Sequence, residues 1–481
     1  MANLDPQLNS APSKINHIHI MGICGTGMAA LAGMLQSSGF TITGSDQNVY
    51  PPMSDFLADL GITVKSGYSK NNLEPRPDLV IVGNVITRKN EEAIHLAELA
   101  IPYLSFPQAL SRFFINSRKS LVITGTHGKT TTCSILASAL YHAELDPTFM
   151  IGGIVPEFGG NFRIGDGEYF VAEGDEYDTA FFDKKSKFLH YQPHIAVITS
   201  LEFDHADIFE DLQSIKRAFR KFVRLIPEDG LLIANFDDEN VRDVISEARC
   251  NVQSYGLNSA YDWSLADVRR GESNLTSFTA LQGGNHYSDI AIQLPGQHNC
   301  LNSLAVTAIL HHIGVPSEKI SSGLKAFSGV RRRQEIRGIE KGITVIDDFA
   351  HHPTAVRETL SALRMAYPDN RLVIVFEPRT NTSRRAIFQK DYVTAFDCSD
   401  VLCIREPVPL TNVAEDNQFS SAQLARDINE TRERKAMAFN DTDAILSYLS
   451  THLESGDIVA ILSNGGFDNI HNRLIEILRN R

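Results

Sequence analysis

The stretch Leu121–Leu140, LVITGTHGKTTTCSILASAL, decides the fold. It consists of an apolar run, a loop with two glycines and a segment whose residues favour a helix. Gly125 and Gly128 allow backbone N–H groups to converge on an anion at the helix N-terminus. Lys129 can reach the β- and γ-phosphates of a nucleotide, and the Thr130 hydroxyl can ligate Mg²⁺. The stretch therefore predicts a strand–loop–helix unit that binds a nucleoside triphosphate.

The spacing of this loop departs from the usual pattern G-x-x-x-x-G-K-[ST], because Ile123 occupies the position of its first glycine. Spacing alone is also compatible with a glycine-rich turn that carries a surface lysine. The strand before the loop, the helix after it and the run Gly128–Thr132 (GKTTT) together favour phosphate binding.

Two clusters of acidic residues follow the phosphate loop, each near the end of a strand-like run. The first is VAEGDEYD (171–178), and the second is SLEFDHADIF (200–209). Mg²⁺ prefers oxygen ligands and is usually bound through one or two carboxylates. Any single carboxylate, taken alone, is also compatible with a solvated loop. The two clusters together predict the metal ligands that a nucleoside triphosphate site requires.

A second strand–glycine–helix unit lies near the N-terminus, in HIHIMGICGTGMAALAGML (17–35). Gly25–Ala30 fits the pattern G-x-G-x-x-A of dinucleotide-binding domains, and Asp46 lies close to the position expected for a ribose-binding acid. Taken alone, this loop indicates an NAD-dependent oxidoreductase. The phosphate loop further along the chain indicates instead that the first loop holds a different diphosphate.

The length of 481 residues predicts several domains, at roughly 100–200 residues each. Short apolar runs alternate with helical patterns along the chain, which is typical of parallel α/β sheets. We divide the chain into segments 1–115, 116–325 and 326–481. Within the second segment, 261–296 alternates in polarity and is interrupted by turn residues, so we expect antiparallel β structure there.

The composition excludes several classes of partner. The formal net charge of -13 disfavours nucleic acid and anionic membrane surfaces, and no apolar run is long enough to span a bilayer. The opening residues lack a basic segment followed by an apolar one, and the six cysteines form no C-x-x-C pair. We therefore expect a cytoplasmic protein in a reducing compartment.

The blocks GTHGKTTT, EGDEYD, LEFDHAD, GQHNCLNSLA, GVRRRQE and DDFAHHPTAV occur here in an order typical of one family. In these blocks the chain resembles the Mur ligases, ATP-dependent enzymes that form amide bonds in peptidoglycan synthesis. The resemblance runs from about residue 17 to the C-terminus. It implies a three-domain α/β fold: a Rossmann-like N-terminal domain for a UDP-sugar, a P-loop ATPase-like central domain for ATP, and an α/β C-terminal domain for the peptide.

The resemblance also implies roles for individual residues. In the first domain, the UDP diphosphate would lie near Gly22, Gly25, Thr26 and Gly27, with Asp46 near the uridine or its ribose. In the central domain, the ATP phosphates would be held by Gly125, Thr126, His127, Gly128, Lys129, Thr130 and Thr131. The Mg²⁺ ligands would be Thr130, Glu173 and His205. The adenine side would be formed by His298, Asn299 and Asn302.

The third domain would complete the site. The resemblance implies that Arg332 or Arg333 reaches the γ-phosphate and that Asp348 binds the ATP ribose. His351, His352 and Arg379 would approach the reacting carboxylate and the incoming peptide. Taken singly, each of these residues is also compatible with packing, capping or a solvated surface.

Within the family, the blocks at 44–62, 175–193, 201–212 and 377–385 are most similar to one branch. Enzymes of that branch join UDP-N-acetylmuramate to the tripeptide L-alanyl-γ-D-glutamyl-meso-diaminopimelate through an acyl phosphate, in peptidoglycan recycling. A close alternative is a ligase that adds free L-alanine to UDP-N-acetylmuramate, and the alternative from a different class is the NAD-dependent oxidoreductase. The expected cofactors are ATP and Mg²⁺. The sequence leaves open the oligomeric state and whether a lysine is carbamylated.

Overall fold

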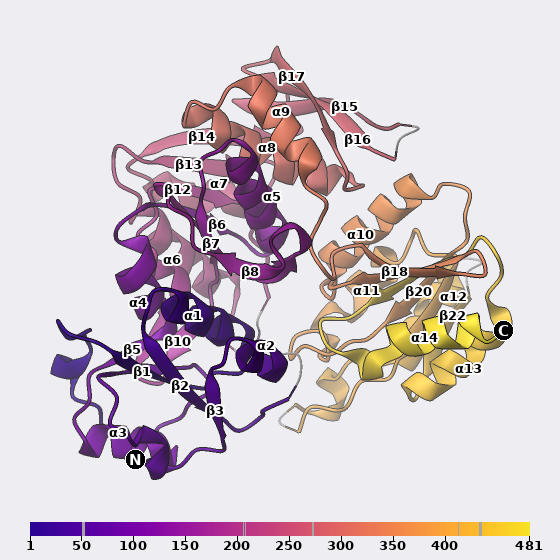
Figure 1. Ribbon diagram of the computed structural model, residues 1–481. Coiled ribbons are helices and arrows are strands. Elements are labelled where there is room, and N and C mark those ends of the chain that lie inside the picture. Colours follow the sequence, from indigo (N-terminus) through magenta and orange to yellow (C-terminus); the bar gives the residue numbers. More distant parts are fainter. Residues whose placement is uncertain (51–52, 205, 207, 272–273, 412, 432–434) are drawn as a thin grey trace.

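The protein is described by a computed structural model that covers residues 1–50, 53–204, 206, 208–271, 274–411, 413–431 and 435–481. The chain folds into three α/β domains, each built on a largely parallel sheet covered by helices (Figure 1). The predicted fold class is therefore confirmed. The main sheets use residues 17–105, 119–292 and 335–462, whereas the domain boundaries at 115 and 325 stay predictions.

The N-terminal domain has a five-stranded parallel sheet in the order β3-β2-β1-β4-β5. The chain order reverses between β1 and β4, and ligands bind at such switch points beside the carboxyl ends of the strands. The first glycine loop follows β1 and therefore lies there. The elements are η1 (Pro6–Leu8), β1 (His17–Met21), α1 (Thr26–Ser37), β2 (Thr41–Asp46), α2 (Met53–Asp59), β3 (Thr63–Ser66), η2 (Lys70–Leu73), β4 (Leu79–Val82), α3 (Glu91–Glu98), β5 (Tyr103–Ser105), α4 (Phe106–Leu110) and η3 (Ser111–Ile115).

The central domain has a ten-stranded sheet in the order β17-β16-β15-β14-β13-β12-β6-β9-β7-β8, and β10 pairs with β11 beside it. Its first elements are β6 (Lys119–Thr124), α5 (Lys129–His142), β7 (Thr148–Val155), η4 (Pro156–Phe158), β8 (Gly160–Arg163), β9 (Tyr169–Gly174), β10 (Asp178–Ala180), β11 (Asp183–Ser186), η5 (Lys187–His190) and β12 (Ile195–Ile198). The remaining elements are α6 (Leu212–Val223), β13 (Leu231–Asn235), α7 (Glu239–Val244), η6 (Ile245–Glu247), β14 (Asn251–Gly256), β15 (Trp263–Arg270), β16 (Thr276–Gln282), β17 (Asn285–Ile292), α8 (Gln297–His312) and α9 (Ser317–Ala326). Strands β15, β16 and β17 pair antiparallel, which confirms the antiparallel structure expected at 261–296.

The C-terminal domain has a six-stranded sheet in the order β18-β19-β23-β20-β21-β22, in which β18 alone pairs antiparallel to its neighbour. Its first elements are β18 (Glu335–Glu340), β19 (Ile343–Asp348), α10 (Pro353–Ala366), β20 (Leu372–Phe376), η7 (Ala386–Phe388), α11 (Gln389–Ala395) and β21 (Val401–Arg405). They are followed by η8 (Glu415–Asn417), α12 (Ser421–Thr431), β22 (Lys435–Phe439), α13 (Thr442–His452), β23 (Ile458–Leu462), η9 (Phe467–Asn469) and α14 (Ile470–Arg479).

The central strands owe their positions to continuous apolar runs. Every residue of β4 (LVIV), β12 (IAVI), β20 (LVIVF) and β23 (IVAIL) is buried. Such runs are characteristic of parallel strands with helices on both faces. Among the described residues, no helix combines the length and apolar content that a bilayer-spanning segment needs.

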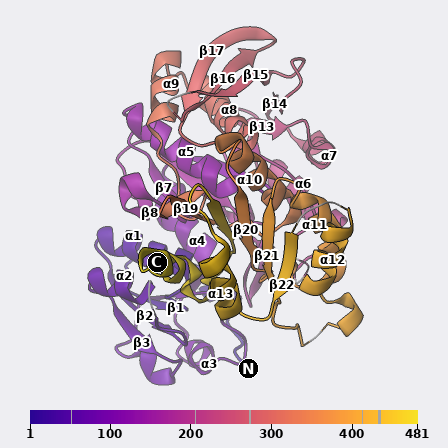
Figure 2. The same cartoon turned by 90° about the vertical axis from the view of Figure 1, so that its right-hand side faces the viewer.

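The central domain contacts both of the others (Figures 1 and 2). Toward the N-terminal domain, the ring of Phe182 packs edge-on against Tyr103 at 4.8 Å between centroids. Toward the C-terminal domain, the backbone N–H of Arg331 donates to the Ile154 carbonyl at 3.0 Å. The linker Phe327–Gln334 therefore runs along the central domain before β18 begins.

A buried polar cluster attaches the first sheet to α3. The Glu92 carboxylate lies 2.9 Å from His19 Nε2, and both side chains are fully buried. It also accepts hydrogen bonds from the Ser45 hydroxyl at 2.7 Å and from the Asn72 amide at 2.8 Å. One carboxylate thus satisfies polar groups from β1, β2 and η2.

We expect Glu92→Ala to destabilise the N-terminal domain by about 3 kcal/mol, because it leaves buried polar groups without a partner. Thermal and urea unfolding, followed by circular dichroism, measures the loss. Glu91→Ala, at the exposed neighbouring position, is the matched control and should change stability little. Equal stability of the two variants would contradict the role assigned to Glu92.

Candidate active site

Three neighbouring cavities lie at the carboxyl ends of the parallel strands. The N-terminal cavity, of about 590 Å³, lies at the first glycine loop, and the phosphate-loop cavity, of about 660 Å³, lies against the second. The interdomain cavity, of about 320 Å³, lies between the central and C-terminal domains. Thr26 and Met53 line the first two cavities, and His127, Gly128 and Arg333 line the last two. The three cavities therefore adjoin one another across all three domains.

The phosphate loop requires glycine at two positions. Gly125 has φ +130° and Gly128 has φ +80°, both in the left-handed region. A Cβ atom on Gly125 would lie 2.3 Å from Thr199 Oγ1, and one on Gly128 would lie 2.9 Å from Asn302 Oδ1. These glycines allow the loop to pack against the strand end and against α8, which opens the N-terminus of α5 toward the cavity.

Lys129 is a buried cation that lines the phosphate-loop cavity. Its Nζ donates to the Gly125 carbonyl at 2.6 Å and to Glu176 Oε2 at 3.2 Å. Burial alone would lower the pKa of Lys129, but the charges of Glu176, Asp175 and Glu173 outweigh it and raise the pKa. The side chain therefore carries a positive charge at neutral pH.

Thr130 and Glu173 form an oxygen-rich pair that fits Mg²⁺. The Thr130 hydroxyl donates to Glu173 Oε1 at 2.9 Å, and the Gly152 N–H donates to Glu173 Oε2 at 2.8 Å. Burial, followed by the charge of Asp175, raises the pKa of Glu173. A divalent cation bound to these oxygens would relieve that repulsion. His205, the other predicted metal ligand, lies outside the described residues.

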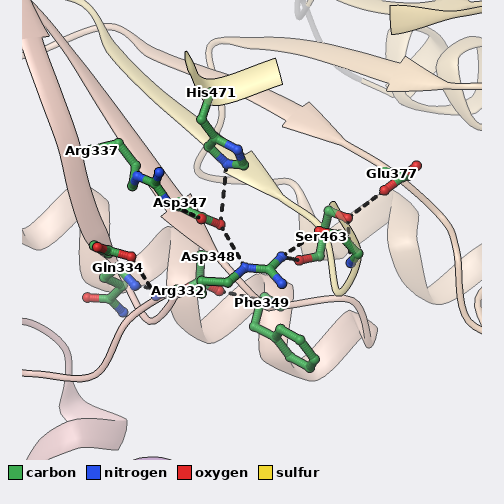
Figure 3. Close-up of polar contacts among 12 residues, drawn as sticks. Arg332, Gln334, Arg337, Asp347, Asp348, Phe349, Glu377, Ser463 and His471 are labelled. Carbon is green, nitrogen blue, oxygen red and sulfur yellow. Dashed lines mark hydrogen bonds and ion pairs between the residues drawn. The ribbon is translucent and has the colours of Figure 1, made fainter. Parts of the chain in front are cut away.

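The two candidate arginines of the linker point in different directions. Arg333 Nη2 lies 3.4 Å from Thr130 Oγ1, so its guanidinium reaches the phosphate loop. Arg332 instead donates to the carbonyls of Ser463 and Gly465, both at 2.7 Å (Figure 3). Of the two, the geometry favours Arg333 as the group that faces a nucleotide.

Asp347 and Asp348 help to fix the linker on the C-terminal domain. Arg332, with φ +62°, forms an ion pair with Asp347 at 3.5 Å, and His471 lies 3.3 Å from the same carboxylate (Figure 3). Gln334, with φ +53°, donates its N–H to Asp348 Oδ2 at 2.8 Å. The residues on either side of Arg333 are thus held in left-handed conformations by C-terminal carboxylates.

The interdomain cavity contains the residues predicted for the adenosine half of a nucleotide. His298, Asn299, Asn302 and Asp348 all line it, together with Thr131, which was predicted for the phosphates. The polar lining residues that sequence reasoning missed include Asn235, Asp237 and Tyr255. They lie at or just after the ends of β13 and β14, so their place at the carboxyl ends of parallel strands was the available signal.

The N-terminal cavity contains Gly22, Gly25, Thr26 and Asp46, as predicted from the first glycine loop. Asp46 shapes this loop by accepting the backbone N–H of Cys24 at 2.9 Å. Gly27 lies outside this cavity and lines a smaller one against the ring of Phe106. Sequence reasoning missed the other polar lining residues, which are Gln47, Asn48, Tyr50, Tyr68 and Asn84.

The remaining predicted residues are only partly brought together. Thr126, Arg332 and His351 line the phosphate-loop cavity. His352 caps the N-terminus of α10 through Nδ1. Arg379 lies outside the lining of all three cavities, with its side chain half exposed beside Glu377.

Comparison with known proteins identifies the family. Residues 17–118 match the Mur ligase family catalytic domain, residues 123–310 the Mur ligase middle domain, and residues 332–465 the Mur ligase glutamate ligase domain. The chain belongs to the Mur ligase family. It is therefore an ATP-dependent ligase of peptidoglycan synthesis, and the oxidoreductase interpretation of the first glycine loop is set aside.

Individual Mur ligases resemble this chain over nearly its whole length. The UDP-N-acetylmuramate–L-alanyl-γ-D-glutamyl-meso-2,6-diaminoheptandioate ligase of Haemophilus influenzae is 36% identical over 97% of this chain and 100% of its own. The UDP-N-acetylmuramate–L-alanine ligase of Acetivibrio thermocellus is 35% identical over 94% of each chain. The crystal structure of a murein peptide ligase from Psychrobacter arcticus matches with a TM-score of 0.71 and 34% identity, over 97% of this chain and 99% of that one.

His298 gives this Mur ligase a pH dependence with a defined sign. Burial, with a smaller effect from Arg333, lowers the pKa of His298 from 6.5 to about 4. The folded protein therefore resists protonation that the unfolded chain accepts near pH 6.5. The stability that neutral His298 contributes is complete above pH 6.5 and is lost as the pH falls toward 4.

Between pH 7 and about pH 4.5, we expect the free energy of unfolding to fall by about 2 kcal/mol less in His298→Gln than in the wild type. Urea unfolding at both pH values measures the difference. His286→Gln, at an exposed position of β17, is the control and should keep the wild-type pH dependence. An identical acid sensitivity in wild type and His298→Gln would show that this histidine is not the cause.

Proposed function

We propose that this Mur ligase joins UDP-N-acetylmuramate to the tripeptide L-alanyl-γ-D-glutamyl-meso-diaminopimelate, as a murein peptide ligase of peptidoglycan recycling. The observation that carries the proposal is the adjoining set of cavities, with Lys129, Thr130, Glu173 and Arg333 facing the middle one. In this assignment the N-terminal cavity takes the UDP-sugar, the interdomain cavity takes the adenosine, and the phosphate-loop cavity is where the two substrates meet.

The chemistry begins with attack by the muramoyl carboxylate on the γ-phosphorus of ATP. An acyl–oxygen–phosphorus bond forms, and the bond to the bridging oxygen breaks, so ADP leaves. The peptide α-amine then attacks the acyl carbon, and inorganic phosphate leaves with the oxygen that joined them. The amine loses a proton to the medium or to a base, and an amide remains.

The chain's own groups counter the repulsion between a carboxylate and a triphosphate. Lys129 and Arg333 provide positive charge on two sides of the phosphate-loop cavity. Such charges act most strongly where water is excluded. Mg²⁺ held by Thr130 and Glu173, with His205 as the proposed further ligand, would supply additional positive charge to the phosphates. Water would also hydrolyse the acyl phosphate, so the central and C-terminal domains must enclose the site.

The loop after β20, EPRTNTSRR (377–385), supports a peptide rather than an amino acid as second substrate. Burial, with a further contribution from the charge of Arg379, lowers the pKa of Arg384, so the two cations are close enough to repel. Within the described part of the chain, the buried Nε of Arg385 has no hydrogen-bond partner. The Thr382 hydroxyl accepts the Ala206 N–H at 3.3 Å, which places this loop against the central domain. The tripeptide carries several carboxylates, whereas L-alanine carries one.

We expect Lys129→Met to lower the rate of ADP release about 10²–10³-fold, because it removes a preorganised cation from the transferring phosphoryl group. Binding of UDP-N-acetylmuramate, measured by calorimetry, should change little. Lys184→Met removes an exposed lysine of the same domain and serves as control. Near-normal turnover in Lys129→Met would refute the assignment of the phosphate loop.

The second substrate is tested by ADP release with UDP-N-acetylmuramate and either tripeptide or L-alanine. We expect faster turnover with the tripeptide than with L-alanine. In Arg385→Met, the KM for the tripeptide should be about tenfold higher than in wild type, because a charged hydrogen bond is lost. Arg426→Met, on the exposed face of α12, is the matched control. Faster turnover with L-alanine would instead assign the chain to the UDP-N-acetylmuramate–L-alanine ligases.

A further inference from the structure

Three side chains from separate segments meet where the central and C-terminal domains touch. His127 comes from the phosphate loop, Glu202 from the segment after β12, and His352 from the N-terminus of α10. Glu202 Oε2 lies 2.9 Å from His127 Nε2 and 3.4 Å from His352 Nδ1. The two imidazole rings lie 4.7 Å apart between centroids. One ligand atom from each residue therefore lies within 4.8 Å of the others.

Neither neutral tautomer of His352 satisfies all the polar groups around its ring. Nδ1 accepts the backbone N–H of Thr354 at 3.3 Å, which requires an unprotonated nitrogen. The same lone-pair atom then faces Glu202 Oε2 with no proton between them. If Nδ1 carries the proton instead, the Thr354 N–H loses its acceptor. Within the described residues, the buried Nε2 has no hydrogen-bond partner in either case.

A cation between the three residues would remove the contact between two unprotonated acceptors, His352 Nδ1 and Glu202 Oε2, in exchange for the long Thr354 N–H bond. It would accept a lone pair from His352 Nδ1, one from Glu202 and one from His127, whose proton can move to its other ring nitrogen. The ionic states are already suitable. Burial lowers the pKa of His352 to about 4. Burial alone would raise the pKa of Glu202, but the hydrogen bonds of His127 and Thr354 and the charges of both histidines together lower it to about 2. At neutral pH these two ligands need no deprotonation.

The set also has an outer support of the kind that orients metal ligands. The Thr354 hydroxyl donates to Glu202 Oε1 at 3.0 Å, which leaves Oε2 directed at the two histidines. His352 is buried, and its ring packs edge-on against Phe388 at 4.6 Å between centroids. Contacts outside the proposed ligand set thus fix the positions of Glu202 and His352.

We propose that His127, Glu202 and His352 bind a transition-metal ion such as Zn²⁺, at a site separate from the magnesium ligands. Two imidazoles and one carboxylate suit Zn²⁺, which accepts three protein ligands and leaves a fourth position open. Mg²⁺ prefers oxygen and would not compete well here. The ion would join the central domain to the C-terminal domain beside the phosphate loop, since His127 lines both the phosphate-loop and interdomain cavities.

The test uses the full-length enzyme without a histidine tag, titrated with Co²⁺ in excess Mg²⁺. Four-coordinate Co²⁺ gives visible absorption bands much stronger than those of six-coordinate Co²⁺, and the excess Mg²⁺ competes with Co²⁺ at the proposed magnesium site. We expect one equivalent of Co²⁺ to produce these bands and one equivalent of Zn²⁺ to abolish them. His352→Gln should weaken Zn²⁺ binding by roughly 100-fold or more, because a lost ligand costs at least as much as a lost outer partner.

Two further variants make the result decisive. Glu202→Gln keeps the shape of the side chain but weakens the ligand, so it should also lower Zn²⁺ affinity. His298→Gln removes a neighbouring histidine of the interdomain cavity that is not part of the set, and it should bind Zn²⁺ like wild type. Circular dichroism confirms that each variant is folded. Absence of the visible bands in wild type, or their persistence in folded His352→Gln, would overturn the proposal.

Discussion

The buried charge of Lys129 is the interaction on which the rest of the active site depends. Its ammonium group is buried, beside Glu176 and near Glu173. The carboxylates keep the lysine protonated, and the lysine in turn partly offsets their mutual repulsion. The excess of negative charge on Glu173 is what a divalent cation would neutralise. A single lysine at the start of α5 thus gives the cavity the charge pattern that the proposed nucleotide and metal would require.

The same local architecture is used twice, in two domains. In each case a parallel strand ends in glycines and an α-helix begins, at β1–α1 and at β6–α5. Backbone amides at a helix N-terminus bind a phosphate without regard to the rest of the ligand. The difference lies in what surrounds each loop. Asp46 accepts a backbone N–H in the first, whereas Lys129 and two carboxylates surround the second. The neighbouring side chains, rather than the loop, make the two sites different.

Much of the fold could be predicted because its determinants are local. The buried strands are continuous apolar runs, and the segment 261–296 alternates in polarity as antiparallel strands do. The site was predictable where a motif placed residues on one loop, as with Lys129 and Thr130. It was not predictable where distant segments meet. The contact between Glu202 and His352 depends on the packing of two domains, and the opposite directions of Arg332 and Arg333 depend on backbone angles that no residue pattern encodes.

The left-handed residues on either side of Arg333 have a mechanical consequence. Arg332 and Gln334 hold unfavourable backbone angles because C-terminal groups bind them, so this end of the linker is fixed to that domain. The Arg333 guanidinium therefore contacts the phosphate loop, while the backbone on either side of it is fixed to the C-terminal domain. A nucleotide that attracts the Arg333 guanidinium must also bias the orientation of the whole C-terminal domain. By reciprocity, whatever restrains that orientation, a bound peptide included, changes nucleotide affinity by the same factor.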